Sequence, residues 1–137
     1  MAHILIVDDE RSICELLEIT FRKGGHRVEV ATSGEEARRR LVSGIFDIVI
    51  SDIRLPDISG VEVLAYAKEV SPSSVFLLIT GVPTVETAIA AVNAGADRYV
   101  IKDHELVDQL RHAVQEVQEK LSLRNEARYL RRELRRF

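Results

Sequence analysis

The chain has 137 residues, of which 46% are hydrophobic and 30% charged, so it can bury the core of one domain and is not expected to be disordered. Its apolar runs have the length of a strand, far short of the roughly 20 residues that a bilayer-spanning helix needs, so we expect no membrane segment. The single cysteine, Cys14, excludes an intrachain disulfide. An N-terminus that leads directly into carboxylates does not resemble a secretion signal, and both features favour a cytoplasmic location.

The charge is unevenly distributed along the chain. Residues 1–119 carry 12 Lys and Arg against 20 Asp and Glu, whereas residues 120–137 carry 7 against 2. The body is therefore acidic, which argues against nucleic-acid binding, and the basic tail is most simply a solvated helix face. We expect no direct nucleic-acid binding by this chain.

Five short runs dominated by Val, Ile and Leu alternate with longer segments of helical periodicity, a pattern typical of βα units and a parallel sheet. The predicted strands are residues 4–7, 28–31, 47–51, 75–79 and 99–101. The second run alternates apolar and polar residues, which favours an edge position. Right-handed crossovers then predict an α/β fold with a doubly wound five-stranded parallel sheet, flavodoxin-like, in strand order 2-1-3-4-5, followed by an extended C-terminal helix.

Helix ends carry their own signals. The pairs Ser33 with Glu36 and Ser59 with Glu62 have the spacing of a reciprocal capping box at the start of the second and third helices. The fourth helix is expected to end at Gly95. On its buried side we expect Val85, Ala88, Ile89 and Val92.

Polar side chains stand where the predicted strands end. Asp8 and Asp9 follow the first strand and Asp52 follows the third, and in a flavodoxin-like order these strands are neighbours at the switch point. Such crowded carboxylates require protonation or a cation, and Mg²⁺ is a hard ion that oxygen ligands bind. Thr80 after the fourth strand can donate to an anionic oxygen, and Lys102 after the fifth supplies a mobile positive charge. Together these groups suit a phosphoryl group in transfer.

These residues lie in motifs that occur together, in order, in a known family. The motifs are Ile-Val-Asp-Asp at 6–9, Asp-Ile-Arg-Leu-Pro-Asp-Ile-Ser-Gly at 52–60, Thr80, and Tyr-Val-Ile-Lys at 99–102. Across about residues 3–118, the sequence resembles the receiver (CheY-like) domain of two-component response regulators. The resemblance implies a signalling switch that assists its own phosphorylation and dephosphorylation.

The resemblance also implies a role for each site residue. Asp52 would be the phosphoacceptor, which attacks a phosphohistidine on a sensor histidine kinase. The Mg²⁺ ligands would be drawn from Asp8, Asp9, Asp52 and the backbone carbonyl of Arg54, with Asp9 favoured as the direct carboxylate ligand beside Asp52.

Two further roles are implied at the ends of the fourth and fifth strands. Thr80 would bind one phosphoryl oxygen and Lys102 would neutralise another. Tyr99 would turn inward as Thr80 moves, which would change the surface formed by the fourth helix, the fifth strand and the fifth helix. The family usually has proline after the lysine, where this chain has Asp103. We therefore expect a trans Lys102–Asp103 bond and an N-terminal cap from Asp103 on the last helix.

Two other function classes remain open. An aspartyl-nucleophile phosphohydrolase generally needs a second carboxylate two residues after the nucleophile, but Arg54 stands there. A phosphorylation-independent interaction module of the same fold would be favoured by the loss of an acidic-site residue, and the acidic site is complete.

The last helix is expected to begin near Asp103 or His104, and no Pro or Gly interrupts it. Beyond the receiver, apolar residues recur at the four- and three-residue spacing of a coiled-coil seam. They are Leu123, Ala127, Leu130, Leu134 and Phe137. The alternative is a solvated helix that frays beyond the body.

We expect residues 1–118 to form the receiver domain and residues 119–137 to form a helical linker that starts a homodimeric coiled coil. A long signalling helix of this kind resembles the nitrogen-regulation (NtrC-type) sigma-54-dependent activators. The resemblance implies an output domain in cis, with an ATPase and a DNA-binding domain, and we expect the chain to be truncated before it.

Overall fold

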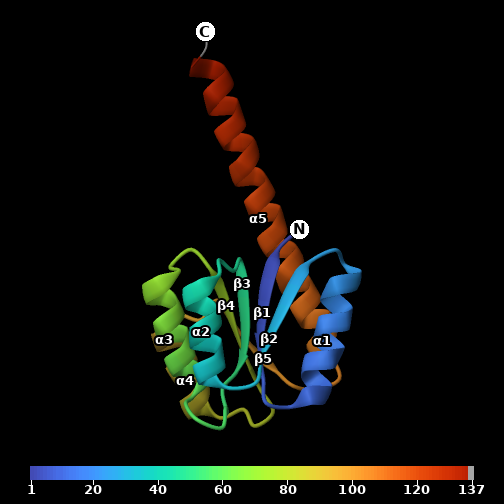
Figure 1. The fold of residues 1–137 in the computed structure, drawn as a ribbon, viewed down its shortest axis with the longest axis vertical. Coiled ribbons are helices and arrows are strands. Elements are labelled where there is room, and N and C mark those ends of the chain that lie inside the picture. Colours follow the sequence, from blue (N-terminus) through green and yellow to red (C-terminus); the bar gives the residue numbers. More distant parts are fainter. Residues whose placement is uncertain (136–137) are drawn as a thin grey trace.

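The computed structural model describes residues 1–135, which form one parallel sheet flanked by helices (Figure 1). The strands are β1 (His3–Val7), β2 (Arg27–Ala31), β3 (Ile48–Asp52), β4 (Val75–Thr80) and β5 (Arg98–Ile101). Their order is β2-β1-β3-β4-β5 and every pairing is parallel. The predicted flavodoxin-like order and the edge position of β2 are confirmed.

Five helices cover the two faces of the sheet. They are α1 (Arg11–Lys23), α2 (Gly34–Ser43), α3 (Gly60–Val70), α4 (Val85–Ala94) and α5 (Leu106–Arg135). Successive side chains of a strand point to opposite faces, so Ile4 and Ile6 of β1 pack in one core with α1 and α5, while Leu5 and Val7 pack in the other with α2, α3 and α4. Apolar residues on both faces explain the nearly continuous hydrophobic runs of the central strands.

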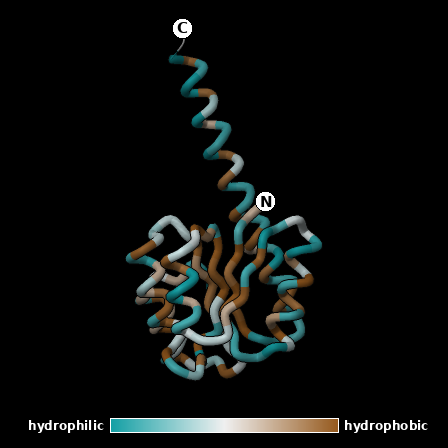
Figure 2. Tube along the Cα trace, viewed as in Figure 1, coloured by the Kyte–Doolittle hydropathy of each residue, from teal (hydrophilic) through white to brown (hydrophobic). Residues whose placement is uncertain are grey.

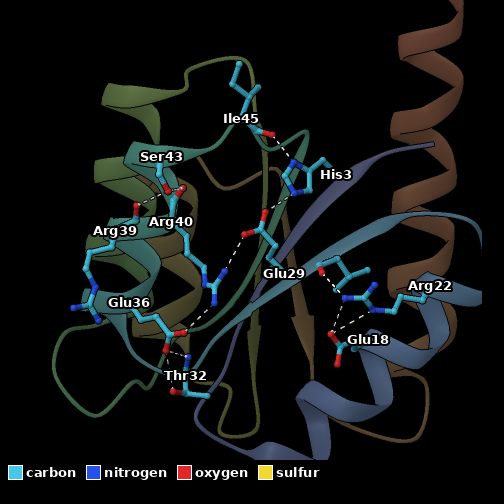
Figure 3. Close-up of polar contacts among 11 residues, drawn as sticks. His3, Glu18, Arg22, Glu29, Thr32, Glu36, Arg39, Arg40, Ser43 and Ile45 are labelled. Atoms are coloured by element: carbon cyan, nitrogen blue, oxygen red, sulfur yellow. Dashed lines mark hydrogen bonds and ion pairs between the residues drawn. The ribbon is translucent and has the colours of Figure 1, made fainter.

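The helix caps match the sequence prediction only in part. Ser33 and Ser59 do accept hydrogen bonds from backbone amides of their helices. The reciprocal bond predicted from Glu36 goes one residue further back, to the backbone N–H of Thr32 at 3.1 Å, while Arg40 binds Glu36 and also Glu29 of β2 (Figure 3). The complete capping box in the described residues is at α4, where the sequence did not suggest one.

The predicted buried side of α4 is wrong. Val85 is 76% exposed, Ile89 54% and Val92 75%, and the buried residue of this helix is Ala91. The inward side of α4 carries small residues: Ala91 lies in the core shared with α2 and α3, and Ala94 packs partly against it. The larger apolar residues therefore point outward. The predicted end at Gly95 is confirmed, in a left-handed conformation.

The last helix, α5, begins at Leu106, and Asp103 caps the preceding turn by accepting from the Glu105 backbone N–H at 2.9 Å. The described residues contain no cis peptide bond, so the predicted trans Lys102–Asp103 bond is confirmed. The buried residues of α5 end at Val117. Beyond that point the helix projects from the body with polar and apolar residues interspersed (Figures 1 and 2).

The long helix does not have the composition of a membrane span. No helix in the described part of the chain is both long and apolar enough to cross a bilayer.

Of the residues predicted to form the coiled-coil seam, Phe137 lies outside the described residues.

Candidate functional site

Four polar side chains meet at the carboxyl ends of the strands. Asp8 follows β1, Asp52 ends β3, Thr80 ends β4 and Lys102 follows β5. Asp8, Asp52 and Thr80 are buried, and the side chain of Lys102 is 7% exposed. The site lies where the strand order reverses between β1 and β3, which is the usual ligand position in an open parallel sheet. The N-terminus and the projecting part of α5 lie at the opposite end of the body (Figure 1).

The ammonium of Lys102 joins three carboxylates. Its Nζ lies 2.7 Å from Asp8 Oδ2, 2.7 Å from Asp52 Oδ2 and 3.0 Å from Glu10 Oε1. The remaining oxygens of the two aspartates accept backbone bonds: Asp8 Oδ1 from the Glu10 N–H at 2.9 Å, and Asp52 Oδ1 from the Arg54 N–H at 3.1 Å. Lys102 therefore supplies the positive charge that this acidic cluster needs.

Burial and ion pairing act in opposite directions on these groups. Burial raises the pKa of Asp8, although the ion pair with Lys102 and the hydrogen bond from the Glu10 backbone oppose this shift. For Lys102, burial alone would lower the pKa, but the bonds to Asp52, Asp8 and Glu10 outweigh burial and raise it. Lys102 is thus held firmly in its charged form, whereas the charge on Asp8 is disfavoured.

The donor set fits a hard divalent cation. One carboxylate oxygen each from Asp8, Glu10 and Asp52 lies within 4.8 Å of the others. Asp8 Oδ2 has no well-aligned hydrogen bond within the described residues, and its close polar partner is the Lys102 ammonium. A set composed only of oxygen atoms suits Mg²⁺ or Ca²⁺ rather than a softer metal.

Of the predicted metal ligands, the structure brings Asp8 and Asp52 together. Asp9 is exposed and is not part of the acidic group, and Arg54 contributes a backbone N–H bond to Asp52. Glu10 was missed by the sequence analysis. Its signal was its place directly after the Asp-Asp pair, in the loop that leaves β1.

The loop after Asp52 is fixed by close backbone packing. Gly60 donates its N–H to the Ile53 carbonyl at 2.8 Å. A Cβ on Gly60 would lie 2.1 Å from the Asp52 carbonyl oxygen, so a residue without a side chain is needed at this contact. Asp57 in the same loop accepts from the N–H groups of Gly34 and Glu35 at the start of α2. These contacts hold the backbone around Asp52 in one position.

The residues predicted to switch conformation connect the site to α4. Thr80 Oγ1 accepts from the Val82 N–H at 3.1 Å, and the Thr80 carbonyl accepts from the Lys102 N–H at 2.8 Å. The half-buried Tyr99 makes a 2.8 Å hydrogen bond between its hydroxyl and Thr87 Oγ1. Because Thr87 belongs to the capping box of α4, Tyr99 is tied to the start of that helix.

Comparison with known proteins gives a consistent set of relatives. The sequence profile of the response regulator receiver domain matches residues 4–115. The transcriptional regulatory protein ZraR of Klebsiella oxytoca is 38% identical over 99 residues, which cover 72% of this chain and 22% of ZraR. The response regulator protein PilR of Pseudomonas aeruginosa is 39% identical over 102 residues, which cover 74% of this chain and 23% of PilR. The chain therefore spans less than a quarter of the length of either relative.

Solved structures of response regulators also resemble this chain. The response regulator protein TrrA from Thermotoga maritima, in complex with Mg²⁺-BeF, is 35% identical with a TM-score of 0.76, and the match covers 85% of this chain and 99% of that one. The beryllofluoride-activated NtrC4 receiver domain dimer is 31% identical with a TM-score of 0.80, covering 88% and 98%.

Proposed function

Because the chain belongs to the response regulator receiver domain family, and is thus a phosphoacceptor switch of a two-component system, we propose that Asp52 is the residue that accepts the phosphoryl group from a sensor histidine kinase. The observation that carries this proposal is the placement of Asp52 Oδ2 in the buried cluster, 2.7 Å from Lys102 Nζ and beside Asp8. Asp8 shares the Lys102 ammonium at the same distance, but its side chain is fully buried, whereas the side chain of Asp52 is 7% exposed and can be reached by a phosphoryl donor.

The chemistry follows from these groups. A carboxylate oxygen of Asp52 attacks the phosphorus of a phosphohistidine, the P–N bond breaks toward the imidazole, and an acyl phosphate forms. Lys102 neutralises one phosphoryl oxygen and the hydroxyl of Thr80 donates to another. Mg²⁺, held by Asp52, by Asp9 or Asp8 and by the Arg54 carbonyl, would supply further positive charge.

We propose that the signal leaves through Tyr99 and α4. When Thr80 turns toward the phosphoryl group, Tyr99 moves inward and gives up its bond to Thr87 at the start of α4. The exposed apolar side of α4 and the adjoining surfaces of β5 and α5 would then present a changed surface to a partner.

Outside the receiver, we propose that residues 119–137 dimerise and lead to an output domain in cis. By analogy with the relatives that span several times this length, the output would be transcriptional, with an ATPase and a DNA-binding domain of the NtrC type. The sensor kinase and this switch would meet in the cytoplasm.

The assignment of Asp52 is tested by incubation with acetyl phosphate and Mg²⁺, followed by intact mass measurement. We expect one added phosphate, and none on Asp52→Asn. Asp57→Asn is the matched control, because it removes an exposed carboxylate from the same loop. Phosphate that persists on Asp52→Asn, or that is lost from Asp57→Asn in a folded protein, would contradict the assignment.

A further inference from the structure

We propose that the projecting part of α5 pairs with the same segment of a second copy as a parallel, in-register coiled coil. Its register is set by two repeated ion pairs between chains, Glu119 with Arg124 of the second copy and Glu126 with Arg131 of the second copy. This inference deepens the proposed function, because it rests on the proposal that residues 119–137 dimerise. It adds the orientation and the residues that select it.

The apolar side of α5 changes direction where the helix leaves the body. Leu110, Val114 and Val117 face the sheet and are buried. At about 100° per residue, Leu123 lies roughly 120° around the helix from Val117. Leu123 is 64% exposed, Leu130 59% and Leu134 75%. Leu123, Leu130 and Leu134 therefore form a second apolar stripe that the body leaves uncovered.

The stripe fixes the heptad positions of its neighbours. With Leu123 and Leu130 at d, and Ala127 and Leu134 at a, the flanking g positions are Glu119 and Glu126 and the flanking e positions are Arg124 and Arg131. In a parallel coiled coil, a g residue meets the e residue five positions later in the other chain, and both glutamates meet an arginine there. Leucine at d also suits a parallel two-stranded arrangement.

Antiparallel pairing of the same stripe would be opposed by charge. It places e against e and g against g, so that arginine would face arginine and glutamate would face glutamate. Like charges this close repel, whereas the parallel arrangement turns all of these contacts into attractive ones. The charge pattern therefore selects one orientation out of two.

The four charges have no partners within their own helix. None of them has an opposite charge three or four residues away, and no ion pair is formed by Glu119, Arg124, Glu126 or Arg131 in the described structure. Arg124 instead has Lys120 and Arg128 four residues away on either side, which is a repulsive spacing on a helix. A glutamate from the second copy would relieve this repulsion, so the pattern is explained by the dimer and not by the single chain.

Charge exchange tests the ion pairs in the 137-residue chain by sedimentation. Glu126→Arg and Arg131→Glu should each raise the dimer dissociation constant about tenfold or more, because each replaces two attractive contacts per dimer with repulsive ones. The double exchange Glu126→Arg with Arg131→Glu should restore it to within about threefold. Arg132→Glu is the matched control, since it makes the same charge change on the side away from the seam. A double variant as weak as the single ones, or a control that weakens the dimer equally, would overturn the proposal.

Orientation is tested by cysteine cross-linking in a Cys14→Ser background. Leu123→Cys and Leu130→Cys should each form a disulfide between chains, because parallel in-register pairing places every d residue opposite its own copy. An antiparallel pair can place at most one of these positions opposite itself, so cross-linking at only one would refute the orientation. If the chain stays monomeric yet still accepts phosphate on Asp52, this inference fails while the proposed phosphoacceptor stands.

Discussion

The carboxylate of Asp8 is fully buried beside Asp52 and shares the Lys102 ammonium with it. Its pKa is raised by burial, so its folded-state pKa lies above its unfolded value and its ionisation above about pH 4 opposes folding. We expect Asp8→Asn to raise the free energy of unfolding at pH 7 by an amount on the order of 1 kcal/mol, since the amide keeps the bond from the Glu10 N–H without the charge. Urea unfolding at pH 7 measures this, and phosphorylation should be weakened in the same variant. A less stable variant would mean that the Lys102 pair outweighs burial.

Gly60 is the second residue at which the site sets a strict requirement. A Cβ there would lie 2.1 Å from the Asp52 carbonyl oxygen and 2.9 Å from its carbon, both of them backbone atoms that have no freedom to rotate away. We expect Gly60→Ala to lower the free energy of unfolding by about 1–3 kcal/mol and to slow phosphorylation. Gly81→Ala is the control near the same site, because its Cβ would meet only Lys102 Cδ at 3.9 Å. Equal effects of the two changes would show that the contact with Asp52 is not the cause.

The sequence predicted those site residues that a strand end fixes in space. Asp8, Asp52, Thr80 and Lys102 each follow or end a strand of the sheet, so the register of the parallel strands brings them to one edge. Glu10 could not be predicted in the same way, because the path of a loop after a strand is not encoded in hydrophobic periodicity.

At the scale of elements, the start of α2 is held by carboxylates. The pKa of Asp57 is lowered by hydrogen bonds from the Gly34 and Glu35 backbone, and that of Glu36 by the bond from the Thr32 N–H. Groups with lowered pKa values contribute stability above their unfolded pKa values, near 4, and this stability is lost as the pH falls further. We expect the free energy of unfolding to drop between about pH 5 and pH 3, and to drop less in Asp57→Asn.

This acid dependence is measured by urea unfolding at a series of pH values. Glu69→Gln is a suitable control, because Glu69 is exposed and accepts no hydrogen bond in the described structure. An acid response that is the same in Asp57→Asn and the wild type would show that the contact between the loop and α2 does not contribute.

The element that the sequence described least well is α4. Its boundaries follow from Thr84 and Gly95, but its apolar residues are abundant on every side, so periodicity does not identify the buried one. The buried residue is Ala91, which packs in the core that α4 shares with α2 and α3. A partner that covered the exposed side of α4 would remove the apolar side chains of Val85, Ile89 and Val92 from water.

In the whole molecule, α5 runs from the end of the body that holds the acidic cluster to the end from which the helix projects (Figure 1). It starts four residues after Lys102. Its first part contributes Leu106, Leu110 and Val114 to the core. A change in the loop that carries Lys102 therefore acts on a helix whose far end is free to meet a second copy.

The division between these parts can be tested by removing residues 119–137. The buried residues of α5 end at Val117, and among the described residues beyond it only Leu121 packs partly against the core. We expect the shortened chain to unfold cooperatively, with a free energy of unfolding lower by about 1 kcal/mol for the lost apolar contact of Leu121, and to accept phosphate on Asp52 as before. In sedimentation it should be a monomer at concentrations where the longer chain is a dimer. A shortened chain that fails to fold would place the domain boundary beyond residue 118, and one that still dimerises would assign the dimer contact to the receiver body.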